Sequence, residues 1–327
     1  MHTSQGDQPP SMRFLYVPIK EAADVPPPYA SGTDLIVGIS YILIAAFMLV
    51  PSVLTIYVLI ARKGVASKRF RKIMLINAFS SCTYIIVNGT AGLLSIFPQH
   101  HSSIVAKISG AVGVFVVILI NGLVSVTAVF RVAYFFRESD VSRCSIVQRF
   151  LFHRRGMQVL LYFTIFVALL EGVILLTPWC SLHYNYVLYA WQYDNSSLTA
   201  VVVKVDLCFS LIAIVVSLVV NIYIAFLVYR KMRHSIGLRY NDIIVQIFVE
   251  SLSVSTIHWL TNVLWHYAFD IFPAEKYFTI GIMIFSAVDR GIIGLLYIIF
   301  NRALRCQVLK TMLCVDSDNP HNVAWIR

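Results

Sequence analysis

Charged residues are scarce in this chain of 327 residues. Asp, Glu, Lys and Arg make up 13% of the sequence, about half their usual share, whereas 58% of the residues are hydrophobic and the mean hydropathy is +0.77. A surface that faces water cannot be built from so few charges, so the composition excludes one or two soluble domains. The chain is therefore expected to lie in a lipid bilayer.

Acidic residues are scarcer than basic ones, with 16 Asp and Glu against 26 Lys and Arg and a net charge of +10. In a soluble protein this excess would suggest binding to nucleic acid. Here most of the basic residues lie in short segments between long apolar runs, where they set the orientation of a membrane protein. We therefore expect no nucleic-acid partner.

Cysteines and targeting signals are also few. The six cysteines are too scattered for a disulfide scaffold or a zinc ribbon: Cys82, Cys144, Cys180, Cys208, Cys306 and Cys314. The first residues, MHTSQGDQPPSMRF, contain no apolar core, so no cleavable signal peptide is predicted. We expect the first spanning helix to direct insertion into the membrane.

Motifs for catalysis, metals and cofactors are absent from the sequence. It contains no Gly-rich phosphate loop and no GxSxG elbow. His258 and His266, at i and i+8 of one predicted helix, lie more than about 10 Å apart by helical rise, too far for one metal ion. We expect no enzymatic activity, no metal and no cofactor.

Seven apolar runs are long enough to cross about 30 Å of hydrocarbon, which needs roughly 20 residues each. They are continuous, unlike the alternating segments of a membrane barrel. The predicted spans are Leu35–Ala61, Ile73–Phe97, Ile108–Phe136, Met157–Trp179, Val201–Tyr229, Ile243–Phe269 and Tyr277–Phe300. The sequence predicts an all-α membrane protein, a seven-transmembrane helix bundle.

The segments between the spans predict the orientation. Basic residues gather between spans one and two, three and four, and five and six, and after span seven, while the alternate loops are nearly free of them. By the positive-inside rule the amino terminus is outside and the carboxyl terminus is cytoplasmic. We expect an extracellular flexible tail at 1–34, a transmembrane domain at 35–300 and a cytoplasmic tail at 301–327.

One glycosylation sequon agrees with this orientation. Asn195-Ser196-Ser197 falls in the longest outer loop, where Asn195 either carries a glycan or is an unmodified polar residue.

Ionisable residues inside the spans are costly in lipid and should face protein or water. The candidates are Arg131, Glu171, Glu250, Asp289 and Arg290. Arg131 lies near the cytoplasmic end of span three. There its guanidinium either reaches the headgroups or binds Asp242, at the start of helix six, or Glu250, two turns deeper in that helix.

Asp289 and Arg290 lie in the middle of span seven. Adjacent side chains on a helix point about 100° apart, so we expect that the two cannot face one partner. Asp289 is predicted to face Ser81 and Asn121. It is either a functional polar centre or part of a network that only holds the helices together.

The segment after span seven has apolar residues at helical spacing with basic residues between them. The apolar residues are Leu304, Val308, Leu309, Met312 and Leu313, and the basic ones are Arg302, Arg305 and Lys310. This pattern predicts a short amphipathic helix on the inner leaflet. Cys306 and Cys314 beside it are either palmitoylation sites or plain thiols.

Together these features resemble G-protein-coupled receptors. The stretch from Tyr297 to Arg305, YIIFNRALR, is similar to the end of helix seven in that family, although Ile293-Gly294 replaces the family's Asn-Pro. At the foot of helix three, Phe130-Arg131-Val132 retains only the arginine. His258-Trp259 in helix six lacks the proline that usually follows the tryptophan.

These departures suit the divergent nematode serpentine chemoreceptors. The run MLVPSVLTIY from Met48, followed by FRKI from Phe70, is similar to the class gamma and class V branch of that group. The family's disulfide at the top of helix three is not expected, because residues 98–121 contain no cysteine, and Cys180 and Cys208 are left as a candidate pair. Helix seven has no lysine beyond Lys276 at its rim, so retinal is not expected.

The resemblance implies a chemosensory receptor in the plasma membrane, in sensory cilia, whose ligand is a small odorant or pheromone-like molecule. Ligand binding would displace helix six and activate a heterotrimeric G protein. Residues expected to line the ligand site, or else to serve only as packing, are Phe115, Phe209, Asn262, Trp265, His266 and Met283. Residues expected to act in coupling are Arg131, Asp242, Glu250, Asp289 and Tyr297.

The alternative is a transporter or channel for a small solute or ion. It would need a continuous polar path lined by Glu171, Glu250, Asp289 and Arg290.

Overall fold

The computed structural model describes residues 30–61, 68–98, 103–138, 154–194, 196–234, 238–271, 276–300 and 302–312. Its elements, in chain order, are α1 (Gly32–Ala61), α2 (Lys68–Ile96), α3 (Ser103–Glu138), α5 (Arg154–Leu176), β1 (Leu182–Asn185), β2 (Ala190–Tyr193), α6 (Ser197–His234), α7 (Leu238–Ile271), α8 (Lys276–Phe300) and α9 (Arg302–Met312).

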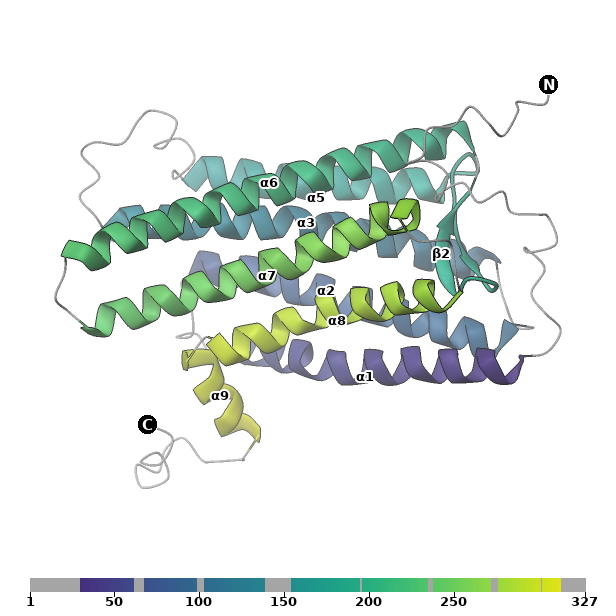
Figure 1. Ribbon diagram of the computed structural model, residues 1–327, viewed down its shortest axis with the longest axis horizontal. Coiled ribbons are helices and arrows are strands. Elements are labelled where there is room, and N and C mark those ends of the chain that lie inside the picture. Colours follow the sequence, from purple (N-terminus) through teal and green to yellow (C-terminus); the bar gives the residue numbers. More distant parts are fainter. Residues whose placement is uncertain are drawn as a thin grey trace.

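The long helices lie side by side in one bundle (Figure 1). The hairpin of β1 and β2 crosses the end of the bundle where α1 begins, and α9 turns away from α8 at the opposite end (Figure 1). Six helices of the described part, all except α7 and α9, are long and apolar enough to span a membrane. With α7, of 34 residues, the predicted seven-helix membrane bundle is confirmed, and the basic segments place the hairpin at its outer end.

Helix ends differ from the predicted spans where the hydrophobic pattern does not set them. α5 ends at Leu176, short of the predicted Trp179, because Pro178 disfavours helical geometry at the residue before it. α6 continues past Tyr229 to His234. The apolar run marks only the part of α6 inside hydrocarbon, and the helix itself extends beyond it.

The helices α1 and α6 both begin at the outer end of the bundle with a serine cap. The Ser31 hydroxyl accepts a hydrogen bond from the Asp34 amide at 3.2 Å, and the Ser31 amide donates to the Asp34 carboxylate at 2.6 Å. This reciprocal pair satisfies free backbone groups at the start of α1. At the start of α6, the Ser196 hydroxyl likewise accepts from the Thr199 amide at 3.2 Å.

The outer surface of the bundle is apolar, unlike the surface of a soluble protein. Large apolar side chains such as Phe47 on α1, Phe166 on α5 and Ile222 on α6 are exposed on its outside, while many Asn, Ser and Thr side chains are buried between helices. Such an outer surface is suited to contact with lipid, because exposing this much apolar area to water would be unfavourable.

Glycines bring two helix pairs into close contact. A Cβ on Gly122 of α3 would overlap the side chain of Thr164 on α5, and one on Gly294 of α8 would lie 2.9 Å from the Ser52 backbone of α1. Small residues at helix crossings allow this approach, which helices in lipid use for van der Waals packing.

The predicted amphipathic helix after span seven is present as α9. Its buried Leu304 and Val308 form a hydrophobic cluster with Val58 of α1 and Tyr297 of α8. This packing holds α9 against the inner end of the bundle.

Candidate functional site

A pocket lies between the helices beneath the hairpin. Its walls come from α2, α3, α6, α7, α8 and the hairpin, and its polar lining includes Asp206, Asn262, His266 and Arg290. The cavity has a volume of about 50 Å³ within a lined region of about 600 Å³ that includes its opening. Apolar walls with a few polar anchors are typical of small-molecule sites.

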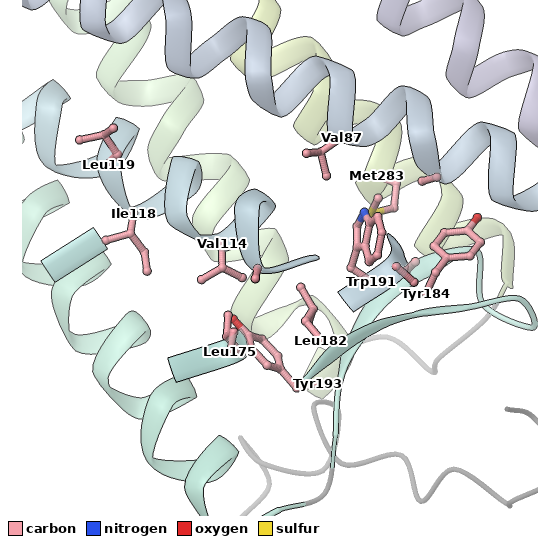
Figure 2. Close-up of a cluster of buried hydrophobic side chains, with 14 of the residues drawn as sticks. Val87, Val114, Ile118, Leu119, Leu175, Leu182, Tyr184, Trp191, Tyr193 and Met283 are labelled. Atoms are coloured by element: carbon pink, nitrogen blue, oxygen red, sulfur yellow. The ribbon is translucent and has the colours of Figure 1, made fainter. Parts of the chain in front are cut away.

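The hairpin forms the roof of this pocket. Leu182 of β1 and Trp191 and Tyr193 of β2 line it, and Figure 2 shows these side chains pointing from the hairpin toward buried residues of the helices. In the antiparallel register Leu182 pairs with Tyr193. These three side chains belong to the same hydrophobic cluster as Val114 of α3 and Met283 of α8, so the roof is packed onto the core of the bundle.

Hydrogen bonds fasten the hairpin to α1 and α2. The Tyr189 hydroxyl donates to the Asp34 carboxylate, and the Tyr189 carbonyl accepts from the Tyr41 hydroxyl at 2.9 Å. The Tyr184 hydroxyl lies 2.7 Å from that of Ser95. Tyr189 has a φ of 54°, a conformation uncommon for a residue other than glycine, and these contacts hold it there.

No disulfide joins Cys180 and Cys208. Both are free thiols, Cys180 buried beside the hairpin and Cys208 exposed on α6. The Thr199 hydroxyl oxygen lies 3.0 Å from the Cys180 sulfur. The roof is thus held by hydrogen bonds and packing among the described residues, not by this candidate pair.

A buried polar cluster lies at the floor of the pocket. Nδ1 of His258 is 2.6 Å from Oδ1 of Asp289, and Nε2 of His258 is 2.7 Å from a terminal nitrogen of Arg290. Because the guanidinium can only donate, Nε2 must be the acceptor and Nδ1 carries the proton that is donated to Asp289. The geometry fixes the neutral imidazole in one tautomer.

The cluster continues across the bundle to α3 and α6. The same Arg290 nitrogen donates to the Asn121 carbonyl at 3.2 Å. The Asn121 amide donates to Ser210 at 3.0 Å and to Asn262 at 3.1 Å, and Ser210 donates to Asp206 at 3.1 Å. We call these residues the central polar network: Asn121, Asp206, Ser210, His258, Asn262, Asp289 and Arg290.

The predicted surroundings of Asp289 are wrong. Asp289 contacts His258 and Arg290, at 2.6 and 3.4 Å, instead of Ser81 and Asn121, and it is Arg290 that reaches Asn121. Asp289 and Arg290 do face one partner. The imidazole offers nitrogens on two edges, and the long arginine side chain bends far enough to overcome the 100° between neighbouring positions.

The predicted ligand-binding residues fall into two groups. Asn262, Trp265 and His266 line the pocket. Phe115, Phe209 and Met283 do not line it and pack in or against the main hydrophobic cluster. A role for any of the six in ligand binding stays a prediction.

Sequence reasoning missed Asp206 and the central place of His258. Asp206 is the one carboxylate within the apolar run Val201–Tyr229. A carboxylate inside a membrane span is costly in lipid, and this could have marked it as a candidate. It is 4% exposed and lines the pocket. His258 was considered as a metal ligand and as part of the His258-Trp259 motif, not as the centre of a polar cluster. Within the described residues no group of three His, Cys, Asp or Glu could hold a metal ion.

Arg131 and Tyr297 lie together at the inner half of the bundle. They line a second cavity of about 20 Å³ with Asn77, Asn221 and Ser255, among others. The Tyr297 hydroxyl accepts from the Asn77 amide at 3.2 Å. The guanidinium carbon of Arg131 is 6.0 Å from the centre of the Phe70 ring.

Several predictions lie outside what is described. The side chains of Asp242 and Glu250, offered as partners of Arg131, are not among the described ones, and neither is Asn195. Glu171 is described: it is 2% exposed on α5, and neither of its carboxyl oxygens accepts a hydrogen bond from a described residue.

The sequence matches no protein-family model and no curated protein. The structure is similar to the crystal structure of squid rhodopsin, with a TM-score of 0.69, 12% sequence identity and coverage of 89% of each chain. At this identity the likeness shows the fold, which is that of a rhodopsin-like bundle of seven membrane helices with a short helix after the last.

Proposed function

We propose that the chain is a G-protein-coupled chemosensory receptor of the plasma membrane. A small extracellular molecule binds beneath the hairpin and displaces α7, which corresponds to the sixth span, so that the inner end of the bundle engages a heterotrimeric G protein. The observation that carries the proposal is the continuity between the outer pocket and the central polar network.

The pocket provides a site whose contacts depend on helix positions. Its lining includes Arg290 of α8, Asn262 of α7 and Asp206 of α6, and the network joins these helices to one another and to α3 through Asn121. A ligand that binds one arrangement of these helices more tightly shifts the population toward it by that difference in affinity.

The second cavity, at the inner half of the bundle, lies where a movement of α7 would be transmitted to the cytoplasmic side. Arg131 of α3, Asn221 of α6, Ser255 of α7 and Tyr297 of α8 line it together, and Asn221 donates to Ser255 at 2.8 Å. A shift of α7 would break this last bond and open the space beside Arg131. Such a rearrangement at the cytoplasmic end is what coupling to a G protein requires.

The chemosensory assignment and the location in sensory cilia rest on the resemblance of MLVPSVLTIY and FRKI to nematode serpentine receptors. An odorant or pheromone-like ligand also agrees with the small size of the pocket, about 50 Å³.

The test is a screen of small odorant-like molecules against cells that express the chain with a panel of G proteins. Calcium and cyclic nucleotide levels are the readout. Arg131→Ala should abolish any ligand-evoked response while surface expression is kept, and Lys204→Ala, at an exposed position near the outer end of α6 and outside both cavities, should retain it.

A response that survives Arg131→Ala would contradict the coupling role of this residue. Solute or ion flux that persists without any G protein would contradict the receptor proposal and favour a transporter or channel.

A further inference from the structure

We propose that the pocket recognises a small molecule that carries one positive charge, a protonated amine, through the carboxylate of Asp206. This rests on the proposed receptor function and names the chemical class of its ligand. Four features carry it: the charge of the cluster, the open hydrogen-bonding capacity of Asp206, the nearby His266 and the aromatic walls.

The charges around the pocket do not balance. Asp289 is compensated by Arg290, whose Nε lies 3.4 Å from its second oxygen, and the geometry makes His258 neutral. Asp206 forms no ion pair with a described basic side chain, and the buried Glu171 of α5 interacts with it electrostatically, so the ionised form of Asp206 has no compensating charge beside it. A buried charge without a partner is unfavourable, so a monovalent cation is the complement that this site lacks.

Asp206 also has unused capacity as an acceptor. It is 4% exposed and lines the cavity, and Ser210 is the one described residue that donates to it, through Oδ1 at 3.1 Å. An ionised carboxylate has about four acceptor positions. An ammonium group in the cavity can occupy the remaining ones with charge-assisted hydrogen bonds, which are the stronger kind.

His266 lines the same cavity and interacts electrostatically with Asp206. No hydrogen bond joins the two side chains or links His266 to any other described residue. A neutral imidazole accepts a hydrogen bond at one nitrogen. It can therefore accept a second N–H of the ammonium group that binds Asp206.

The walls suit a cation with a small apolar body. Tyr84, Trp191, Tyr193 and Trp265 line the pocket, and Figure 2 shows Trp191 and Tyr193 pointing inward from the roof. Aromatic faces attract a cation within about 6 Å. Among the residues the structure describes, the lining contains no lysine and no arginine besides Arg290, which is paired with Asp289.

The experiment measures binding to the purified full chain in lipid nanodiscs by thermal unfolding, without a G protein. The probes are isobutylammonium chloride, isobutanol, sodium isobutyrate and sodium chloride at equal millimolar concentrations. The amine should raise the unfolding temperature by a few degrees, and the isosteric alcohol, the carboxylate and sodium chloride should not.

Variants assign the effect to the pocket. Asp206→Asn keeps the shape and the bond from Ser210 but removes the charge, and it should weaken amine binding by at least about tenfold, the usual scale for a lost bond to a charged group. Lys204→Gln removes an exposed charge of the same helix that does not line the cavity, and it should leave binding unchanged. Should Asp206→Asn fail to fold, the comparison of amine with alcohol on the unmodified chain decides alone.

Equal shifts of the unfolding temperature with amine and alcohol would overturn the inference. So would a shift with sodium chloride that Asp206→Asn abolishes, because it would indicate a site for an inorganic cation. A neutral molecule that evokes G-protein signalling while amines do not bind would overturn it and leave the receptor function intact. Amine binding that never couples to any G protein would support the inference and contradict the receptor function.

Discussion

Nδ1 of His258 on α7 lies 2.6 Å from Oδ1 of Asp289 on α8, and the two side chains are 3% and 0% exposed. The pair joins two helices whose relative movement the proposed mechanism requires. Arg290 closes the arrangement by contacting both residues. Each charge in this cluster is stable in the interior because its partner is present.

Removal of Asp289 should therefore destabilise the bundle more than removal of the whole ion pair. Asp289→Ala leaves the Arg290 charge buried and should lower the free energy of unfolding by about 3–5 kcal/mol. The Asp289→Ala, Arg290→Met double variant should recover a large part of this loss. Denaturant unfolding in detergent measures both.

A double variant that is less stable by the sum of the two single losses would show that the residues act independently. That result would contradict the compensated pair.

The contact between α3 and α5 gives a second prediction. Gly122→Ala places a methyl group against the buried Thr164 side chain, and overpacking of this kind should cost about 1–3 kcal/mol. Gly281→Ala on α8 is the matched control, because a Cβ there meets nothing within 4 Å. Thermal unfolding should separate the two variants by several degrees.

Thr164→Ala should partly rescue Gly122→Ala, since it removes the atoms nearest to the new methyl group. Equal stability of the Gly122 and Gly281 variants would show that α3 and α5 can move apart at no cost.

The course of the chain through the membrane was predictable because it depends on long apolar runs and on the placement of basic residues. The rotation of each helix was not. Asp289 sits in an apolar run whose faces differ little in composition, so nothing in the sequence indicates that it faces His258 and not Ser81. Partners on different helices become visible only when the helices are packed together.

The residues of the pocket also divide into those predictable from their position along a helix and those that depend on contacts between helices. Asn262, Trp265 and His266 were predicted from their position in the outer half of span six, which depends only on their place along a helix. Asp206 was not predicted, because a single carboxylate among apolar residues forms no pattern. Its place in the site depends on Ser210, Arg290 and His266, which come from other turns and other helices. The hairpin roof was predicted only as a loop.

Reducing agent should not affect the stability of the hairpin, because Cys180 is a free thiol. Millimolar dithiothreitol should leave the unfolding temperature of the full chain unchanged, whereas loss of a structural disulfide typically costs about 2–5 kcal/mol. Cys180→Ala is the control. A fall of several degrees that the Cys180→Ala chain does not show would reveal a disulfide at this cysteine.

Asp194, between the hairpin and α6, predicts a dependence of stability on pH. Partial burial raises the pKa of Asp194, but hydrogen bonds from Thr199, Ser181 and the Ser196 amide lower it by more, so the net pKa lies below its ordinary value. A group whose pKa is lowered by folding stabilises the folded state above its unfolded pKa, about 3.9 for Asp, and that contribution is lost as the pH falls through the folded value.

Asp194→Asn should therefore be less stable than the unmodified chain at pH 7 and at pH 5, and the difference between them should shrink as the pH falls below about 4. Thermal unfolding of both chains at pH 7, 5, 4 and 3 measures this difference, and the other carboxylates cancel because both chains contain them. The neutral amide can still accept hydrogen bonds, so the variant should keep the hairpin in place. A difference that grows on acidification would mean that the Asp194 carboxylate is disfavoured by its surroundings, and the hydrogen bonds from Thr199 and Ser181 would then not be the ones that secure the roof of the pocket to α6.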